Sequence, residues 1–292
     1  YYERNNVRVV HGRVQKINVT KRTAVSDQGQ EFPWDRLLLA VGGKPVLLEK
    51  LAQGRRNVTG FYTLEDAVRI DSLIKDGSKA VIIGAGLVGM KAAEALHYRG
   101  VDSVVVDAAP RIMPAALCAD ASLVVQQHME KYGVQFRLGK TVTAVEGEPA
   151  AEKVELSDGE KISCDLVVVA AGVRPNLDLV AGTDIKHEQG ILVDKRQETS
   201  VKDIYAAGDA AQGYELLGQS RRVVALLPVA YEQGLIAGTN MAGGQAEYRG
   251  AVPFNSTSLF GMVVMSGGNS TGDGPSRKWE NPQTAYRKVV VE

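Results

Sequence analysis

The chain has 292 residues, enough for two domains and part of a third. Its 34 Lys and Arg balance 34 Asp and Glu, so no net charge favours nucleic acid or an anionic membrane as a partner. No apolar run approaches the roughly 20 residues that span a bilayer, and no signal peptide is evident. We therefore expect no nucleic-acid partner and no membrane partner.

The two cysteines, Cys118 and Cys164, lie far apart and form no C-x-x-C pattern. We expect buried thiols in a reducing compartment, the cytoplasm, with a redox-active thiol as the alternative. The four histidines lack metal-ligand spacing, so we expect no metal site.

The first 45 residues predict a β-meander followed by a buried return strand. The expected strands and hairpin turn lie, in chain order, at Val7–Val10, 12–19, Thr23–Ser26 and 27–30. An apolar strand over residues 35–40 then runs into Gly42.

The next segment predicts a helix, a strand, a glycine-rich turn and a second helix. Thr63 and Asp66 form the start signal of a helix expected over Leu64–Lys75. The apolar run Lys79–Ile83 then ends at three glycines with the spacing G-x-G-x-x-G, and good helix formers follow.

Each glycine of this loop has a physical role. Gly84 allows the tight turn, Gly86 lets the backbone approach a pyrophosphate, and Gly89 lets the helix pack close to the strand. The pyrophosphate would bind the free N–H groups at the helix N-terminus, where the dipole favours negative charge. The loop predicts a dinucleotide site, and the alternative is a glycine-rich turn without a ligand.

A second apolar strand, residues 103–107, ends at Asp107, where this fingerprint places a carboxylate for ribose hydroxyls. No basic residue directly follows Asp107 to receive a 2′-phosphate, and Arg111 comes four residues later. We therefore predict NAD rather than NADP.

The meander pattern recurs after the glycine loop. Residues 134–175 repeat the order of residues 7–45 and end in an apolar strand that runs into Gly172. If the first copy was built alike, its own glycine loop belongs at least about 40 residues upstream of Tyr1. We expect the chain, which does not begin with Met, to be a fragment truncated at the N-terminus and also at the C-terminus. The alternative is that the first meander is a docked hairpin module.

The rest of the chain predicts two helices, a buried strand and a new domain. The helices are expected at Ala121–Tyr132 and Pro228–Ala242. The strand Ile204–Ala207 ends at Gly208-Asp209, so Asp209 is expected to bind a ribityl or ribose hydroxyl, or to cap a helix. Alternating strand patterns from Gly250 onward mark the third domain.

Together these motifs resemble the FAD/NAD-linked pyridine nucleotide-disulfide oxidoreductase superfamily. They are the glycine loop with Asp107, the two strand-to-glycine returns and Gly208-Asp209. Residues 89–94 and 255–261 are most similar to the NADH:rubredoxin reductase and NADH-dependent nitrite reductase branch. The resemblance implies an α/β fold with two Rossmann-like dinucleotide-binding domains, each with a β-meander. The first of these would be incomplete, and the start of an α+β interface domain would follow.

The resemblance also implies a division of the chain. Residues 1–65 and 174–249 would form a discontinuous, incomplete FAD domain, and residues 66–173 an NAD domain. Residues 250–292 would begin the interface or dimerisation domain. Because the superfamily often dimerises through that domain, a homodimer is one expected state.

The cofactor contacts implied by the resemblance fall into two sets. For FAD, Val14 and Gly42 would lie near the adenosine, Asp209 would hold the ribityl–phosphate region, and Leu226 would lie by the flavin ring. For NAD, Asp107 would bind the ribose and Gly172 would line the nicotinamide side. The residues expected to cradle the NAD pyrophosphate are Gly84, Ala85, Gly86, Leu87, Val88 and Gly89. Lys91 would lie near the flavin, where many relatives have Glu.

The implied activity is hydride transfer from NADH to FAD and onward electron transfer to an acceptor. The acceptor would be a rubredoxin- or ferredoxin-like protein, a nitrite module or a disulfide. The sequence departs from the family because the first glycine fingerprint and the redox-cysteine region are missing. Two alternatives therefore stay open: an NAD-binding fragment without flavin or turnover, and a non-redox NADH sensor.

Overall fold

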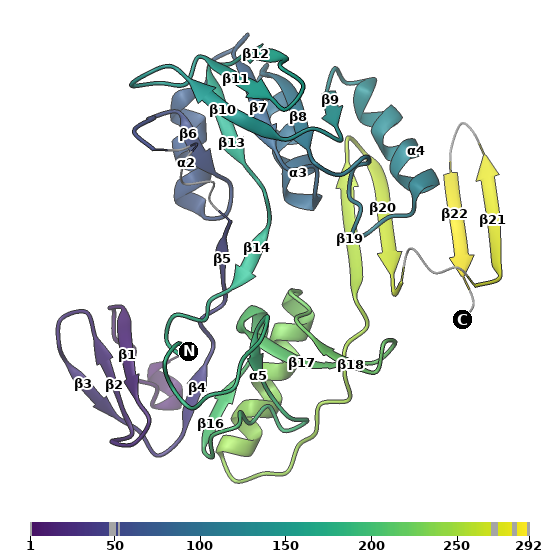
Figure 1. Cartoon of the computed structure of the whole chain (residues 1–292). Coiled ribbons are helices and arrows are strands. Elements are labelled where there is room, and N and C mark those ends of the chain that lie inside the picture. Colours follow the sequence, from purple (N-terminus) through teal and green to yellow (C-terminus); the bar gives the residue numbers. More distant parts are fainter. Residues whose placement is uncertain (1, 47–50, 52, 270–273, 282–284, 291–292) are drawn as a thin grey trace. The chain divides into compact units, whose positions relative to one another are not determined.

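A computed structural model describes residues 2–46, 51, 53–269, 274–281 and 285–290 (Figure 1). The chain divides into two compact units, residues 1–44 with 174–252 (unit 1) and residues 45–173 with 253–292 (unit 2). The chain passes between the units three times, in β5 (Gly43–Pro45), in β14 (Val173–Pro175) and between Val252 and Pro253. The strands β5 and β14 pair with each other.

Unit 2 is built on a five-stranded parallel sheet in the order β6-β13-β7-β8-β9. The strands are β6 (Val58–Gly60), β7 (Lys79–Ile83), β8 (Asp102–Asp107), β9 (Gln135–Leu138) and β13 (Leu166–Val169). Val81, Ile82, Val167 and Val168 have no exposed surface. These runs are continuously apolar because both faces of a parallel sheet are covered.

Helices cover one face of this sheet and a second meander covers the other. Ile82, Val105 and Val168 pack against the helices α2 (Leu64–Leu73), α3 (Leu87–His97) and α4 (Ala119–Glu130). Val81 and Ile83 pack against the antiparallel meander β10 (Val142–Glu146), β11 (Lys153–Leu156) and β12 (Lys161–Ser163). Unit 2 is thus a three-layer structure (Figure 1).

Two hairpins complete unit 2. They are β19 (Phe254–Leu259) with β20 (Met262–Gly267), and β21 (Ser276–Asn281) with β22 (Ala285–Val290). At the tip of the first hairpin, Phe260 stacks on Tyr132 with ring centroids 4.3 Å apart and lies edge-on to His97. This contact joins the first hairpin to the helix-side core.

The start of α2 follows local capping chemistry. Thr63 and Asp66 form the predicted capping box, with the Asp66 N–H 3.2 Å from the Thr63 hydroxyl. The helix α2 ends at Leu73, two residues before the predicted end, and α4 begins at Ala119, two residues before the predicted start.

Unit 1 contains the first meander, β1 (Val14–Asn18), β2 (Thr23–Ser26) and β3 (Glu31–Pro33). Its return strand β4 (Leu37–Leu39) pairs in parallel with β16 (Ile204–Ala206). The remaining elements are η1 (Glu3–Asn5), β15 (Ile191–Leu192), η2 (Gly208–Ala210), β17 (Ala211–Glu215), β18 (Ser220–Arg222) and α5 (Leu227–Met241). A core that includes Leu39, Ile191 and Ile204 holds the strands together.

The predicted repeat is confirmed at the level of strand register. Both meanders carry a bulge in their first strand, between Val14 and Lys16 in one and between Val142 and Ala144 in the other. Each meander is followed by a parallel return strand, β4 or β13. The predicted α/β architecture with two meanders is therefore correct.

The predicted strand at Val7–Val10 is wrong. These residues belong to no strand, and Val7, Val9 and Val10 are 46–50% exposed. The matching segment of unit 2 forms β9 because β8 lies beside it as a hydrogen-bonding partner. No strand of the described chain takes that place in unit 1.

The compact units do not coincide with the predicted domains at every boundary. Residues 45–65 and 253–292 lie in unit 2. The assignment of FAD, NAD and interface domains to the chain stays a prediction. Across the described residues, the structure has no helix that is both long and apolar enough to cross a membrane.

Candidate functional site

The glycine loop of unit 2 is shaped by two close backbone contacts. Gly84 has φ +115°, and a Cβ added there would overlap the carbonyl group of Ala170. A Cβ on Gly89 would overlap the carbonyl oxygen of Gly84. These positions need glycine because helix α3 lies directly against the strand and the neighbouring loop.

The helix that follows begins at an open end. Gly86 is the N-cap of α3 and provides no side-chain cap, and a Cβ on Gly86 would meet nothing within 4 Å. The first N–H groups of a helix have no intrahelical acceptor, so those of Leu87 and Val88 are available to a ligand. A bare helix N-terminus with space beside its glycine fits the pyrophosphate of a dinucleotide.

Asp107 braces this loop with both carboxylate oxygens. One oxygen accepts the Ala85 N–H at 2.6 Å, and the other accepts the Ala109 N–H at 2.7 Å. The first bond places the carboxylate beside the glycine loop, as the ribose assignment requires. The bracing role was not predicted, because nothing in the sequence pairs Ala85 with Asp107.

Lys91 is held by a buried carboxylate rather than left free. Its ammonium forms an ion pair with Glu94 and donates to the carbonyl oxygen of Ser258 at 3.1 Å. Glu94 also accepts the Phe260 N–H at 2.6 Å. Glu94 and Lys91 therefore join the β19–β20 hairpin to the helix that follows the glycine loop.

An apolar groove lies between the starts of α2 and α3. Its volume is about 450 Å³, and its lining residues are Phe61, Tyr62, Thr63, Leu64, Ala67, Leu87, Val88 and Lys91. A groove with one cation and mostly apolar walls suits a planar ring with few polar groups.

In unit 1, two predicted residues follow the carboxyl ends of paired strands. Leu39 and Ala206 are opposite each other in the parallel pair β4–β16, and Gly42 and Asp209 each come three residues later. Asp209 is half-buried, and in the described part of the chain its carboxylate has no hydrogen-bond or ion-pair partner. A Cβ on Gly42 would meet nothing within 4 Å. An open edge with an unengaged carboxylate fits a ligand rich in hydroxyls, such as FAD.

The structure places the other predicted residues as follows. Leu226 is the N-cap of α5, which packs against η2 and therefore against the Asp209 turn. Val14 opens β1 and is partly exposed. Gly172 is exposed with φ +106°, and its carbonyl oxygen accepts the Val46 N–H at 2.9 Å. In the described part of the chain, no contact places Val14 beside the Asp209 edge, so its role stays a prediction.

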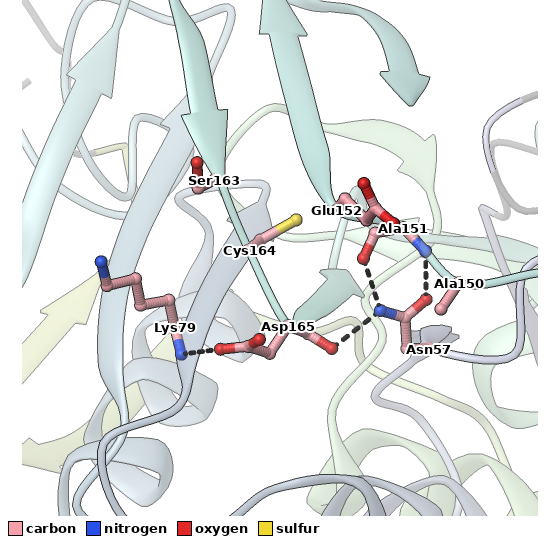
Figure 2. Close-up of a pocket in the computed structure, with 8 residues that line it drawn as sticks. All are labelled: Asn57, Lys79, Ala150, Ala151, Glu152, Ser163, Cys164 and Asp165. Atoms are coloured by element: carbon pink, nitrogen blue, oxygen red, sulfur yellow. Dashed lines mark hydrogen bonds between the residues drawn. The ribbon is translucent and has the colours of Figure 1, made fainter. Parts of the chain in front are cut away.

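A second cavity, of about 480 Å³, lies at the opposite end of the unit 2 sheet (Figure 2). Figure 2 shows the Asn57 amide between Ala151 and Asp165, and it donates to their carbonyl oxygens at 2.8 Å each. Asn57 also accepts the Ala151 N–H at 2.6 Å. Its hydrogen bonds join chain segments, so we interpret this cavity as a structural joint.

The two cysteines differ in environment. Cys164 lines the second cavity, where burial, helped by the charge of Asp165, raises the pKa of its thiol to about 12. Cys118 is half-buried at the start of α4, which corrects the expectation that both thiols are buried. Burial alone would raise the pKa of Cys118, but hydrogen bonds to Tyr286 and Ala121 and the charge of Lys288 lower it.

A sequence profile of the family described as pyridine nucleotide-disulphide oxidoreductase matches residues 1–234. The chain belongs to this family. The nitrite reductase NAD(P)H of Bacillus subtilis is 32% identical over 100% of this chain and 36% of that protein. The NADH-rubredoxin oxidoreductase of Clostridium acetobutylicum is 27% identical over 97% of this chain and 69% of that protein. The predicted resemblance, including its branch, is confirmed by these matches.

A solved structure supports the same fold. The FAD-dependent pyridine nucleotide-disulphide oxidoreductase of Desulfovibrio vulgaris matches with a TM-score of 0.83 at 29% identity. The match covers 94% of this chain and 73% of that one. The predicted class, an FAD- and NAD-linked oxidoreductase fold, is therefore correct. The chain spans about a third of the length of the Bacillus subtilis relative.

Sequence reasoning missed two buried polar side chains that organise these sites, Glu94 and Gln233. Both are at least nine-tenths buried, and each lies on the apolar stripe of its helix. A polar residue at a stripe position is the signal that would have indicated them, because such residues are rarely buried without a partner.

Proposed function

We propose that this chain is the nucleotide-binding part of an NADH-dependent, FAD-containing oxidoreductase. The observation that carries the proposal is the open N-terminus of α3 behind a glycine loop braced by Asp107. Family membership supports the same conclusion.

In unit 2, the backbone would bind NADH and side chains would orient it. The N–H groups of Leu87 and Val88 would hold the pyrophosphate beside Gly86. Asp107 would accept a ribose hydroxyl with the lone pairs that its two backbone bonds leave free. Ala85 and Gly172 would contact the bound NADH through their backbone atoms.

The apolar groove would receive the nicotinamide end of NADH. Leu87 and Val88 would exclude water from the ring, which prevents side reactions of a bound hydride donor. Lys91 would remain paired with Glu94 and add positive charge at one end of the groove. No proton-transferring side chain is needed for hydride donation.

In unit 1, Asp209 would hold FAD by accepting a hydroxyl hydrogen bond, with Gly42 giving room for close approach. Leu226 and Val14 would add apolar contacts. When both groups are bound, NADH supplies a hydride and FAD accepts the electron pair for delivery to an acceptor.

The acceptor would be a small redox protein, a nitrite-reducing module or a disulfide. The first two classes are suggested by the names of the relatives, NADH-rubredoxin oxidoreductase and nitrite reductase. A cytoplasmic location follows from the expected reducing compartment, and a homodimer is the proposed assembly.

The test is an anaerobic spectrum of the purified chain after incubation with FAD and removal of free flavin. We expect a visible flavin band that bleaches when NADH is added. In the Asp107→Ala variant, bleaching should require a higher NADH concentration, because the variant lacks the proposed carboxylate contact with the NADH ribose. A retained band that NADH does not bleach would contradict the redox proposal.

A second candidate is an NAD-binding chain without flavin turnover. It is favoured by one observation: in the described chain, only unit 2 has a glycine loop with a helix behind it. The same experiment distinguishes the two, because this candidate predicts NADH binding without any retained flavin band.

A further inference from the structure

The turn that presents Asp209 is held by one side chain. Gly208 follows β16 with φ +73°, and its N–H donates to Oε1 of Gln233 at 2.8 Å. Gln233 lies on α5 and is 3% exposed. Burying an amide without a hydrogen-bond partner costs free energy, so loss of this contact would destabilise the folded chain.

The surroundings leave Gln233 little freedom. A Cβ added to Gly213 would lie 3.1 Å from its Nε2 atom. Ala230 lies three residues before Gln233 on α5, and a Cβ on Gly208 would lie 3.4 Å from its Cβ. The helix α5 therefore packs tightly against the turn and directs the Gln233 amide at it.

Asp209 itself has no side-chain partner in the part of the chain that the structure describes. The direction of its carboxylate consequently depends on the backbone of the turn. We propose that Gln233 is a positioning residue, which fixes the Gly208–Asp209 turn so that Asp209 can accept a hydroxyl hydrogen bond from FAD. The role toward FAD rests on the proposed function.

A purely structural role for Gln233 makes different predictions. Asn240 lies on the same helix, is 2% exposed and donates to the carbonyl oxygens of Arg196 and Ala246 at 2.9 Å each. It also accepts the Ala246 N–H at 2.9 Å. Asn240 thus matches Gln233 in burial and chemistry and bonds a different segment.

The experiment compares Gln233→Met, which keeps the volume and removes the acceptor, with Gln233→Glu, which keeps an acceptor. Asn240→Ala is the control for lost stability. Amide hydrogen exchange of the Gly208 N–H and the dissociation constant for FAD are measured on the full chain, with the thermal midpoint of each variant.

We expect Gln233→Met to speed Gly208 exchange and weaken FAD binding by about 10-fold each, the equivalent of one lost hydrogen bond. Gln233→Glu should keep the Gly208 exchange rate and the FAD affinity near their wild-type values. Asn240→Ala should lower the thermal midpoint and leave the Gly208 exchange rate and the FAD affinity unchanged. The proposal is overturned if Gln233→Met lowers the midpoint without changing Gly208 exchange or FAD affinity.

A measurement on the unaltered chain covers the case in which Gln233→Met does not fold. FAD should slow exchange of the Gly208 N–H more than exchange of the Ala246 N–H, and equal effects would contradict the proposal. If the wild type binds no FAD, the proposed function fails for this chain. Gly208 exchange in Gln233→Glu and Gln233→Met still decides whether Gln233 fixes the turn.

Discussion

The two units contain the same repeat in different surroundings. In unit 2 the return strand β13 pairs with β6 on one edge and with β7, the strand before the glycine loop, on the other. In unit 1 the return strand β4 pairs with β16, and no second strand partner occurs among the described residues. The same repeat thus contributes to a five-stranded parallel sheet in unit 2 and to a two-stranded sheet in unit 1.

The difference shows how strongly strands depend on partners. The segment Gln135–Leu138 is a strand because β8 supplies its hydrogen bonds, whereas Val7–Val10 stays unpaired. The two proposed ligand sites also differ in construction. The site proposed in unit 2 is a helix N-terminus with a braced loop, and the site proposed in unit 1 is a turn held by Gln233.

The largest expected effect concerns the glycine loop of unit 2. Gly89→Ala should disrupt unit 2, because its Cβ would overlap the Gly84 carbonyl oxygen. Gly86→Ala should fold normally, since its Cβ has open space, yet weaken NADH binding at least about 10-fold by blocking the pyrophosphate. Circular dichroism would measure the folding of each variant, and calorimetry would measure its NADH affinity.

Gly234→Ala on α5 is the control for this pair. Its Cβ also has open space, and it lies in unit 1. It should leave NADH affinity unchanged. Wild-type NADH affinity in Gly86→Ala would contradict the assignment of the loop.

The next effect concerns the joint in unit 2. Asn57→Ala should lower the free energy of unfolding by about 3 kcal/mol, because three backbone groups lose buried hydrogen bonds. Denaturant titration followed by circular dichroism would measure it. Asn18→Ala, at an exposed turn of the unit 1 meander, should cost less than about 1 kcal/mol. Equal costs would mean that Asn57 does not join the layers.

A smaller effect is expected at the hairpin contact. Glu94→Ala should lower the free energy of unfolding by about 2 kcal/mol and speed exchange of the Phe260 amide, since that N–H loses its acceptor and Lys91 loses its ion-pair partner. Glu94→Gln keeps an acceptor for Phe260 and should cost less. The surface variant Glu130→Ala serves as the control. Unchanged Phe260 exchange in Glu94→Ala would show that the hairpin is not held by this residue.

The smallest effect is a pH dependence in the unit 2 meander. Hydrogen bonds from Arg137 and then Lys140 lower the pKa of Glu160. A lowered pKa adds stability above the unfolded-state value of about 4.3, and this stability is lost as pH falls through the folded-state pKa. Glu160→Gln should therefore lower the thermal midpoint at neutral pH and have progressively less effect in acid.

Glu31→Gln in the unit 1 meander is the matched control for this pH dependence. Among the described residues, Glu31 has no ion pair. The variant should match wild type at every pH. A midpoint difference for Glu160→Gln that does not change with pH would contradict the role of its charge.

Much of this structure could be predicted because its signals are local. The glycine loop, the capping box at Thr63 and the repeat all depend on residues within one or two elements of each other. The contacts between Glu94 and Phe260 and between Asn57 and Ala151 could not be predicted. Each joins residues far apart in the chain, and their geometry depends on the packing of whole elements.

The Val7–Val10 error has the same origin. Its three valines are suitable for a strand, but pairing is decided by a neighbouring strand that local sequence does not encode. For the sites, the positions of Asp107 and Asp209 at strand ends made them candidates in the sequence, and their ligand roles stay predictions. The hydrogen bonds that brace Asp107 and the Asp209 turn required the structure.

The most direct test of the account is a pair of binding measurements on wild type, Asp107→Ala and Asp209→Ala. Losing charge-assisted hydrogen bonds worth about 1.5–3 kcal/mol should weaken NADH binding by roughly 10- to 100-fold in Asp107→Ala and leave FAD binding unchanged. Asp209→Ala should weaken FAD binding and leave NADH binding unchanged. Unchanged NADH affinity in Asp107→Ala, or unchanged FAD affinity in Asp209→Ala, would contradict the assignment of one nucleotide to each unit.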